Sequence, residues 1–593
     1  QKSEDQRMLW SYYFRGGQFE DARKVLEQLY QANKEDSNTV KGLLLIAEKT
    51  ADEEAIKKYS EELLSLEDTL ENRLFQIQAF LEVGLVKEAE YKLQGFKEKF
   101  PDEPKALLLE AWVAMRQGQL KKALDLVNRN LETTQDDAAA WRLRGQINFL
   151  MASYDQAIID LKKSKSLLAD PATQIALARA YQRAGRGEDA ITELEGILDS
   201  SQASMQARTM LEQMYWQLRK KEALKSFYEE TLKKFPDNVD WLNRAGSFAI
   251  AAGEVDRAEQ LYKQAWEKSK QNGNGDSMSL EGYLQSLIAG EKMDKFFEEA
   301  GKYVDSNFAS VTLVKMAEAK LKLGDKDAAI QYLRKAVDKA GTDEVLISSI
   351  LGRMYTLLGP EEVQKYCQER LKINPDSLAA NMAMFNLKVM NSEYNSAVEY
   401  IDKCLQIIGP SSPDRINYIT KKAEAFTSAY TKTSDNNYLK KAIAEYESLL
   451  AEMPNNPDVL NNLAYMLAED NTRLAEAMEY AKQASEARPN NPSFLDTYSY
   501  LLYKNGKLSE AAESLQAALQ QYEQNKIFAP SDVYEHLGMI KEGLGSVDEA
   551  LAAYRQALEI GAGQLSDVTS GRIKAAIERL STNRASSSSP GTP

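Results

Sequence analysis

The feature that most constrains this chain is a short pattern, Gly-x-x-x-x-Ala, that recurs in one phase along its length. Weaker copies fill the gaps between the clear ones, and neighbouring copies are mostly 33 to 35 residues apart. A fixed period of this size indicates an array of small stacked units, so the roughly four globular domains expected from length alone are replaced by about sixteen units. The clear copies are Gly17/Ala22, Gly84/Ala89, Gly118/Ala123, Gly185/Ala190, Gly253/Ala258, Gly324/Ala329, Gly506/Ala511 and Gly545/Ala550; the weaker ones centre on Ala55, Ala157, Ala223, Lys295, Val363, Ala397, Ala442 and Ala477.

Each unit is predicted to be a pair of helices. Apolar residues at helical spacing precede the Gly, as in Leu177-Ala178-x-x-Tyr181. The Gly supplies the positive φ that ends the first helix. The Ala then begins the contact face of the second helix, where a small side chain lets two helices approach to ~8 to 10 Å. In five units a Pro stops the second helix: Pro101, Pro236, Pro375, Pro454 and Pro489.

The best units, Trp141-x-x-x-Gly145…Ala157…Leu161 and Tyr534-x-x-Leu537-Gly538…Gly545…Ala550…Tyr554, resemble the tetratricopeptide repeat family. The resemblance covers about Leu9 to Ile560. It implies an all-α fold, a right-handed superhelical solenoid of antiparallel helix hairpins whose concave wall consists of the first helix of each unit. A single hairpin cannot bury its apolar face, so neighbouring hairpins must stack.

Places where the spacing between repeats departs from 33 to 35 residues predict how the solenoid is divided. The segment Gly409-Pro410-Ser411-Ser412-Pro413 predicts a joint between an N-terminal array (1–408, about twelve units) and a C-terminal array (409–563, about four units). We expect a capping helix over 564–582, with Val568, Ile573 and Leu580 on one face, and a flexible Ser/Pro-rich tail over 583–593. Extra residues at Gln271–Asp276 and an enlarged turn at Thr431–Asn437 lengthen two steps.

Charge and hydropathy narrow the class of partner and compartment. The formal net charge is −15 and the pI is near 5.1, which argues against nucleic acid or an anionic membrane as the main partner. No stretch approaches the ~18 to 20 apolar residues of a membrane helix. The polar start at Gln1, without Met, is what removal of a signal peptide leaves, and equally what trimming leaves. Together with a resemblance to long bacterial repeat proteins, it favours a periplasmic or other extracytoplasmic compartment over the cytoplasm.

Catalytic, cofactor and metal sites are not expected. The sequence holds no phosphate-binding Gly loop, CxxC, HExxH or GxSxG element in a suitable context. His536, the single histidine, is expected to be a surface or groove residue rather than a ligand or base. Cys367 and Cys404 fall on second helices of neighbouring units and are expected to be small buried hydrophobes, with a disulfide between them left open.

The family resemblance also implies which residues face a partner, at five places on the first helix of each unit. In the N-terminal half these places combine arginines with aromatics, a composition typical of interface hot spots, although any long polar groove lining includes some Arg. They are Trp112, Met115, Arg116, Arg142, Gln146, Phe149, Arg179, Arg183, Arg208, Tyr215 and Trp216. The C-terminal places are aromatic and acidic: Asn462, Met466, Asp496, Tyr500, Tyr503, Glu535 and Met539.

From these residues we expect a non-enzymatic scaffold that binds proteins in its concave groove and assembles a larger complex. Arginine suits the carboxylates of an acidic peptide or protein segment. The different composition of the two arms predicts two partners, or two parts of one. The alternative is a regulatory sensor, in which a peptide or small ligand changes the shape of the superhelix and hence its affinity for a partner. An enzyme would require a cryptic site around His536.

Overall fold

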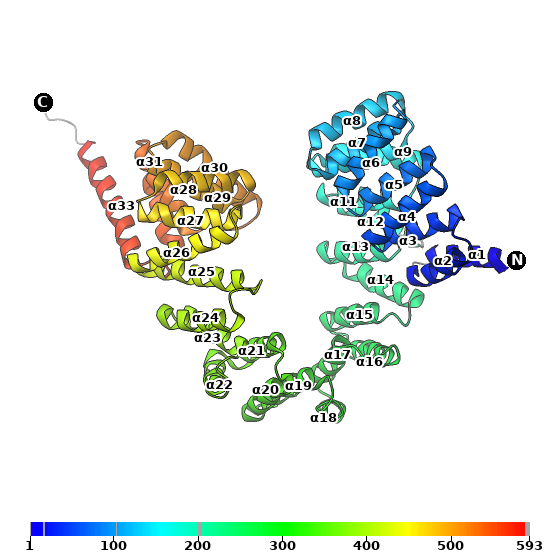
Figure 1. Cartoon of the computed structure of the whole chain (residues 1–593). Helices are drawn as coiled ribbons and strands as arrows, with labels where there is room; N and C mark the ends of the chain where they lie inside the picture. Colours follow the sequence, from blue (N-terminus) through cyan, green and yellow to red (C-terminus); the bar gives the residue numbers. More distant parts are fainter. Residues whose placement is uncertain (1, 16–17, 102, 200–203, 274, 588–593) are drawn as a thin grey trace. The chain divides into compact units, whose positions relative to one another are not determined.

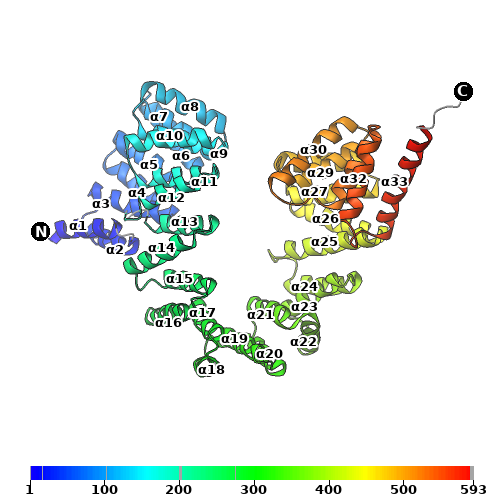
Figure 2. The same ribbon diagram turned by 180° about the vertical axis from the view of Figure 1, so that it is seen from behind.

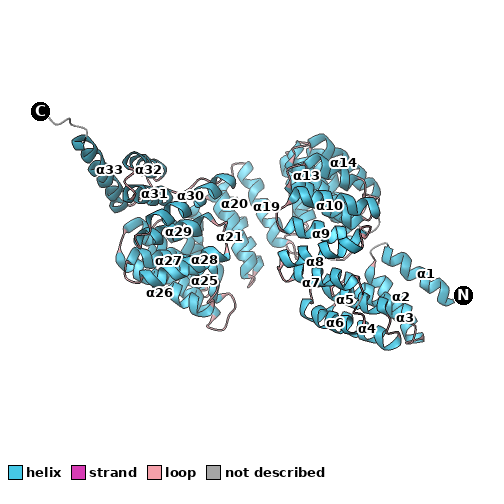
Figure 3. Ribbon diagram, turned by 90° about the horizontal axis from the view of Figure 1, so that it is seen from above, coloured by secondary structure: helices cyan, strands magenta, loops and turns pink. Residues whose placement is uncertain are grey.

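The computed structural model describes residues 2–15, 18–101, 103–199, 204–273 and 275–587 (Figure 1). Every regular element within those ranges is an α-helix, and there are thirty-three of them (Figure 3). The helices pack as hairpin pairs, and thirty-three described helices are consistent with about sixteen hairpins and one final helix. The predicted all-α solenoid of helix hairpins is therefore confirmed. None of these described helices is long and apolar enough to span a bilayer.

The chain divides into two compact units, residues 1–248 and 249–593, and α15 crosses the boundary between them. The joint predicted at Gly409–Pro413 lies inside the second unit, as the link between α24 and α25, and a division there stays a prediction. The helices up to this boundary are α1 (Lys2–Arg15), α2 (Phe19–Ala32), α3 (Ser37–Lys49), α4 (Glu53–Leu66), α5 (Leu70–Glu82), α6 (Val86–Lys99), α7 (Lys105–Arg116), α8 (Leu120–Thr133), α9 (Ala138–Leu150), α10 (Tyr154–Leu167), α11 (Pro171–Arg183), α12 (Gly187–Glu195), α13 (Ser204–Gln217), α14 (Lys221–Lys234) and α15 (Val239–Ala252).

The second unit is also built of helices that follow one another as hairpins. Its helices are α16 (Val255–Gln271), α17 (Ser277–Ala289), α18 (Met293–Gly301), α19 (Ala309–Lys322), α20 (Lys326–Ala340), α21 (Glu344–Leu358), α22 (Pro360–Ile373), α23 (Leu378–Met390), α24 (Tyr394–Ile408), α25 (Arg415–Thr433), α26 (Asn436–Glu452), α27 (Pro457–Asp470), α28 (Leu474–Ala487), α29 (Pro492–Lys504), α30 (Leu508–Gln524), α31 (Ser531–Gly543), α32 (Val547–Ile560) and α33 (Asp567–Ser587).

The turn inside each hairpin needs one residue with positive φ. The repeat glycines supply it: the φ values of seven of them lie between +74° and +88°, and the eighth, Gly17, lies outside the described residues. Only glycine adopts this conformation without steric cost. The glycines that confirm the prediction are Gly84, Gly118, Gly185, Gly253, Gly324, Gly506 and Gly545.

Three of the weaker copies were placed one residue too early. Positive φ falls on Ala51, Arg219 and Glu291, and the buried contact residues that follow are Ile56, Leu224 and Phe296. The predicted anchors Ala55, Ala223 and Lys295 lie one position before them and are not buried. The error arose because neither the turn Gly nor the small contact residue is present in these units.

Helix ends follow the prolines as predicted. The second helices of five units, α6, α14, α22, α26 and α28, each end two residues before their Pro. The enlarged turn predicted at Thr431–Asn437 is wrong, because only Ser434 and Asp435 separate α25 from α26. The extra residues lengthen the two helices instead. Helix α33 runs to Ser587, past the expected end at 582, and residues 588–593 lie outside the described residues.

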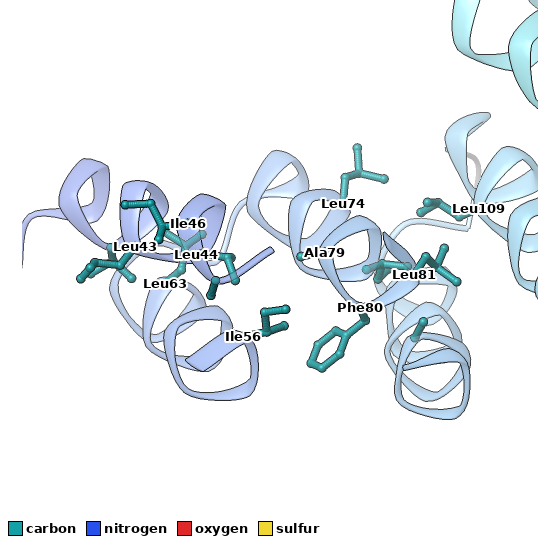
Figure 4. Close-up of a cluster of buried hydrophobic side chains, with 14 of the residues drawn as sticks. Leu43, Leu44, Ile46, Ile56, Leu63, Leu74, Ala79, Phe80, Leu81 and Leu109 are labelled. Carbon is teal, nitrogen blue, oxygen red and sulfur yellow. The ribbon is translucent and has the colours of Figure 1, made fainter. Parts of the chain in front are cut away.

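The core is continuous between hairpins rather than divided among them. One cluster of buried side chains runs from Ala22 of α2 through α3, α4 and α5 to Val113 of α7. Figure 4 shows part of it, with side chains of α3, α4, α5 and α7 meeting between the helices. Each hairpin therefore completes its apolar burial only against its neighbours. The labelled side chains are Leu43, Leu44, Ile46, Ile56, Leu63, Leu74, Ala79, Phe80, Leu81 and Leu109.

Enlarging a repeat Ala should break this packing. Ala190 of α12 is fully buried, so we expect Ala190→Trp to destabilise its hairpin by ~1 to 3 kcal/mol or more through overpacking. Thr192→Trp, on the exposed side of the same helix, should have little effect. Limited proteolysis of the two variants checks this, and equal resistance around residue 190 in both would contradict the assigned register.

The two cysteines are buried, unpaired thiols, one on α22 and one on α24, as the interpretation of small buried hydrophobes predicted. Burial raises the pKa of both Cys367 and Cys404 to about 12.

We therefore expect neither thiol to react with an aromatic disulfide reagent at pH 8 in the folded chain, because the thiolate is the reactive form. Both should react on unfolding in guanidinium. Stoichiometric reaction of native protein within minutes would contradict this placement.

Candidate protein-binding surface

A hollow of about 940 Å³ lies on the inner side of the first unit, across α5, α7, α9 and α11. Sequence positions fix these four helices as neighbours, since each is the first helix of consecutive hairpins. Asp137 and Asp170 set where α9 and α11 begin, because their carboxylates accept backbone N–H groups at 2.8 Å (Ala139) and 3.0 Å (Thr173). Seven predicted partner residues line the hollow: Trp112, Met115, Arg116, Arg142, Gln146, Phe149 and Arg179.

The hollow has an aromatic and aliphatic surface that the sequence prediction only partly named. Phe75, Leu108 and Leu150 join Trp112 and Phe149 in its lining. Most of the missed residues occupy the same places of their units as the predicted ones, so extending the rule to the α5 unit and to every place in the next two units would have found them. The lining residues that this extension would have found are Glu71, Leu74, Gln78, Glu82, Lys105, Leu108, Ala139 and Leu150.

The arginines of the hollow are weakly engaged by the chain itself. Arg142 Nη1 lies 3.4 Å from Oδ1 of Asp170, a carboxylate already used to cap α11. Arg116 donates to the carbonyl of Glu82 at 3.5 Å. Within the described ranges Arg179 has no carboxylate partner. Three guanidinium groups thus retain donors for an anion, beside apolar surface that a side chain could cover.

The remaining predicted residues of the first unit lie elsewhere. Arg183 is exposed and contacts the Tyr154 hydroxyl at 3.4 Å, outside the hollow's lining. Arg208 is buried, where it donates to Thr231 Oγ1 at 2.8 Å. Tyr215 is also buried and donates to Glu195 at 2.7 Å. Trp216 is 46% exposed and meets Phe248 edge-on. These four residues do not join the hollow.

The predicted C-terminal residues form an interior rather than an open groove. Met466 and Tyr500 are buried, while Asn462 and Tyr503 are half-buried. The Tyr500 hydroxyl donates to Glu469 Oε1 at 2.7 Å, and Tyr430 donates to Glu469 Oε2 at 2.8 Å. Two further predicted residues, Asp496 and Glu535, are buried as well. This face of the second unit is filled by its own side chains.

Comparison with known families identifies the repeat. Tetratricopeptide repeat models match residues 80–147, 171–195, 217–272, 312–338, 435–492 and 499–564, which together are just over half of the chain. The chain belongs to the tetratricopeptide repeat family. Proteins of this family are typically non-catalytic binding scaffolds. The comparison with curated proteins found no match to this chain.

Several solved structures are similar to this chain at low identity. Naa15/Naa10 bound to HypK-THB shares 13% identity over 100% of this chain and 98% of that one, with a TM-score of 0.40. Yeast Tom70 shares 15% over 83% and 98%, with a TM-score of 0.29. A tetratricopeptide repeat protein of Parabacteroides merdae shares 12% over 46% and 98%, with a TM-score of 0.34. At these values no partner or activity transfers.

The one histidine occupies an unexpected place in this repeat array. His536 of α31 is 3% exposed, so the expected position on the surface or in the groove is wrong. Its Nδ1 lies 2.9 Å from Oδ1 of Asp496, and its ring stacks on Tyr500 with centroids 4.1 Å apart. These three residues come together because α29 and α31 contact each other. Among the described residues no group of three His, Cys, Asp or Glu could hold a metal ion.

Charge decides the protonation of this histidine. Burial alone would lower its pKa, but the carboxylates of Asp496, Asp532 and Glu535 raise the pKa of His536 to about 9. Burial raises the pKa of Asp532 as well. The imidazolium is thus the form held at neutral pH, paired with Asp496.

This pairing predicts a pH dependence above neutrality. A raised pKa contributes stability that is complete below about pH 6.5 and is lost as pH rises towards 9, up to about 3 kcal/mol. Hydrogen exchange of α31 amides, corrected for intrinsic rates, measures the loss. In His536→Gln the slope between pH 6.5 and 9 should flatten, because the chain has no second histidine. An unchanged slope in the variant would contradict the assignment.

Proposed function

We propose that this protein is a non-enzymatic, protein-binding scaffold that assembles a multiprotein complex through the inner surfaces of its repeats. The observation that supports it most is the hollow of α5 to α11, where Arg116, Arg142 and Arg179 lie beside Trp112 and Phe149. Aromatic and Arg side chains carry most of the binding energy at protein interfaces.

The partner segment we propose is acidic with apolar side chains. Its carboxylates would pair with guanidinium groups that the chain leaves weakly engaged, and its apolar groups would cover the aromatic surface. Glu71, Glu82 and Asp137 also line the hollow, so a uniformly acidic polymer would meet repulsion. A mixed segment of acidic and apolar residues satisfies both features.

Charge reversal in the hollow tests the proposal. Arg142→Glu with Arg179→Glu should leave the helical circular dichroism unchanged and weaken capture of the main partner from the native source at least tenfold, because attraction becomes repulsion. The matched control is Arg129→Glu with Lys162→Glu, the same charge change at exposed positions of α8 and α10. Equal capture by both double variants would rule out the hollow as the binding surface.

A further inference from the structure

Helix α33 covers the last hairpin with a small apolar face. Ile573, Ala576 and Leu580 are buried against a cluster that includes Leu551 and Tyr554 of α32. Figure 2 shows α33 beside α32 at the end of the array. Most other described positions of α33 are exposed and polar. An apolar cap alone would need nothing more from this helix.

A second side of α33 carries arginines that face acidic residues. Arg572 Nε lies 2.8 Å from Oε1 of Glu535, and Arg579 pairs with Glu542. Both glutamates belong to α31. The two arginines are seven positions apart in the sequence, and so are the two glutamates. Seven residues are about two helical turns, so each pair occupies one side of its helix and the two sides match.

The surface beneath Arg572 is acidic and aromatic, and we call Glu469, Tyr500 and Glu535 the acidic inner face. Glu469 and Tyr500 act electrostatically on Arg572, and the Glu535 side chain is only 5% exposed. At the start of α33, Ser566 Oγ lies 3.1 Å from Ser434 Oγ at the end of α25. The beginning of α33 therefore spans from the last hairpin to a helix 132 residues earlier.

We infer that the acidic inner face is a docking surface for an arginine-bearing helix, and that α33 of the same chain occupies it as an internal ligand. Without α33 the Glu535 carboxylate would lose the arginine that pairs with it at 2.8 Å, and the acidic inner face would be left without this cation. The surface therefore selects a cation to replace the one it loses. The Arg572 side chain is 51% exposed, so its contact is reachable from solvent and can be exchanged.

The internal helix also specifies the chemistry of a competitor. It would be an amphipathic helix with arginines at i and i+7 and apolar residues at i+1, i+4 and i+8, as at 572, 579, 573, 576 and 580. A tethered α33 holds an effective concentration of about a millimolar, so an untethered helix competes only once α33 is loosened. This inference is independent of the hollow in the first unit.

A labelled peptide of residues 565–587 tests this in the full-length chain. Ala576→Pro breaks α33 in its middle while leaving α25 to α32 intact. We expect the peptide to bind this variant and to bind wild-type protein at least tenfold more weakly. A peptide carrying Arg572→Glu should bind the variant at least tenfold more weakly than the native peptide. A peptide carrying Lys574→Glu, the same charge change at an exposed position, should bind like the native one.

Either of two peptide results would overturn the inference. The first is that the native peptide does not bind an Ala576→Pro variant that keeps its native helix content. The second is that the Arg572→Glu peptide binds this variant as tightly as the native peptide does. Equal binding would mean that α33 is an apolar cap only. Hydrogen exchange keeps the inference testable if Ala576→Pro misfolds. Full-length Arg572→Glu should exchange at least tenfold faster than Lys574→Glu in α33 and around Tyr500, and equal rates would reject the inference.

Discussion

The interaction on which the structure depends is the burial of small and apolar side chains between neighbouring hairpins. Ala157, Ala190 and Ala258 are fully buried where two helices meet, and the next hairpin covers what remains. Because this buried cluster passes from one hairpin to the next, none of the hairpins that it joins has a separate core. In the described hairpin turns, a residue with positive φ lets the chain reverse from the first helix into the second.

The functional surfaces follow from that constraint. One face of the first helix of each repeat packs against neighbouring helices. The partner-facing places lie on the rest of that helix. In the first unit they leave a hollow with Trp112 and three weakly engaged arginines. In the second unit two of the corresponding places hold the buried residues Tyr500 and Glu535, and Arg572 of α33 pairs with Glu535. One repeat thus yields an open surface at one end and an occupied one at the other.

The sequence predicted the repeat, the glycine turns and the proline-limited helix ends because each depends on local backbone chemistry. It misplaced the contact residue in the units of Ile56, Leu224 and Phe296, where bulky side chains replace the small one and the turn residue is not Gly. The hollow was found in part, since the family's partner-facing places gave Trp112, Arg142 and Arg179. Burial of Arg208, Tyr215 and His536 was not foreseen, because it depends on neighbours about 20 to 40 residues away.

The central claim is that a partner's acidic segment lies in the hollow of α5 to α11. Lys105 is the one lysine among the described residues that line it, and its amine can be coupled directly to a carboxylate within contact distance. Zero-length carbodiimide crosslinking of the native complex, read by mass spectrometry, tests the claim most directly. The predicted result is a bond between Lys105 and an Asp or Glu of the partner. Crosslinks confined to lysines of the outer helices, such as Lys122 and Lys162, would contradict it.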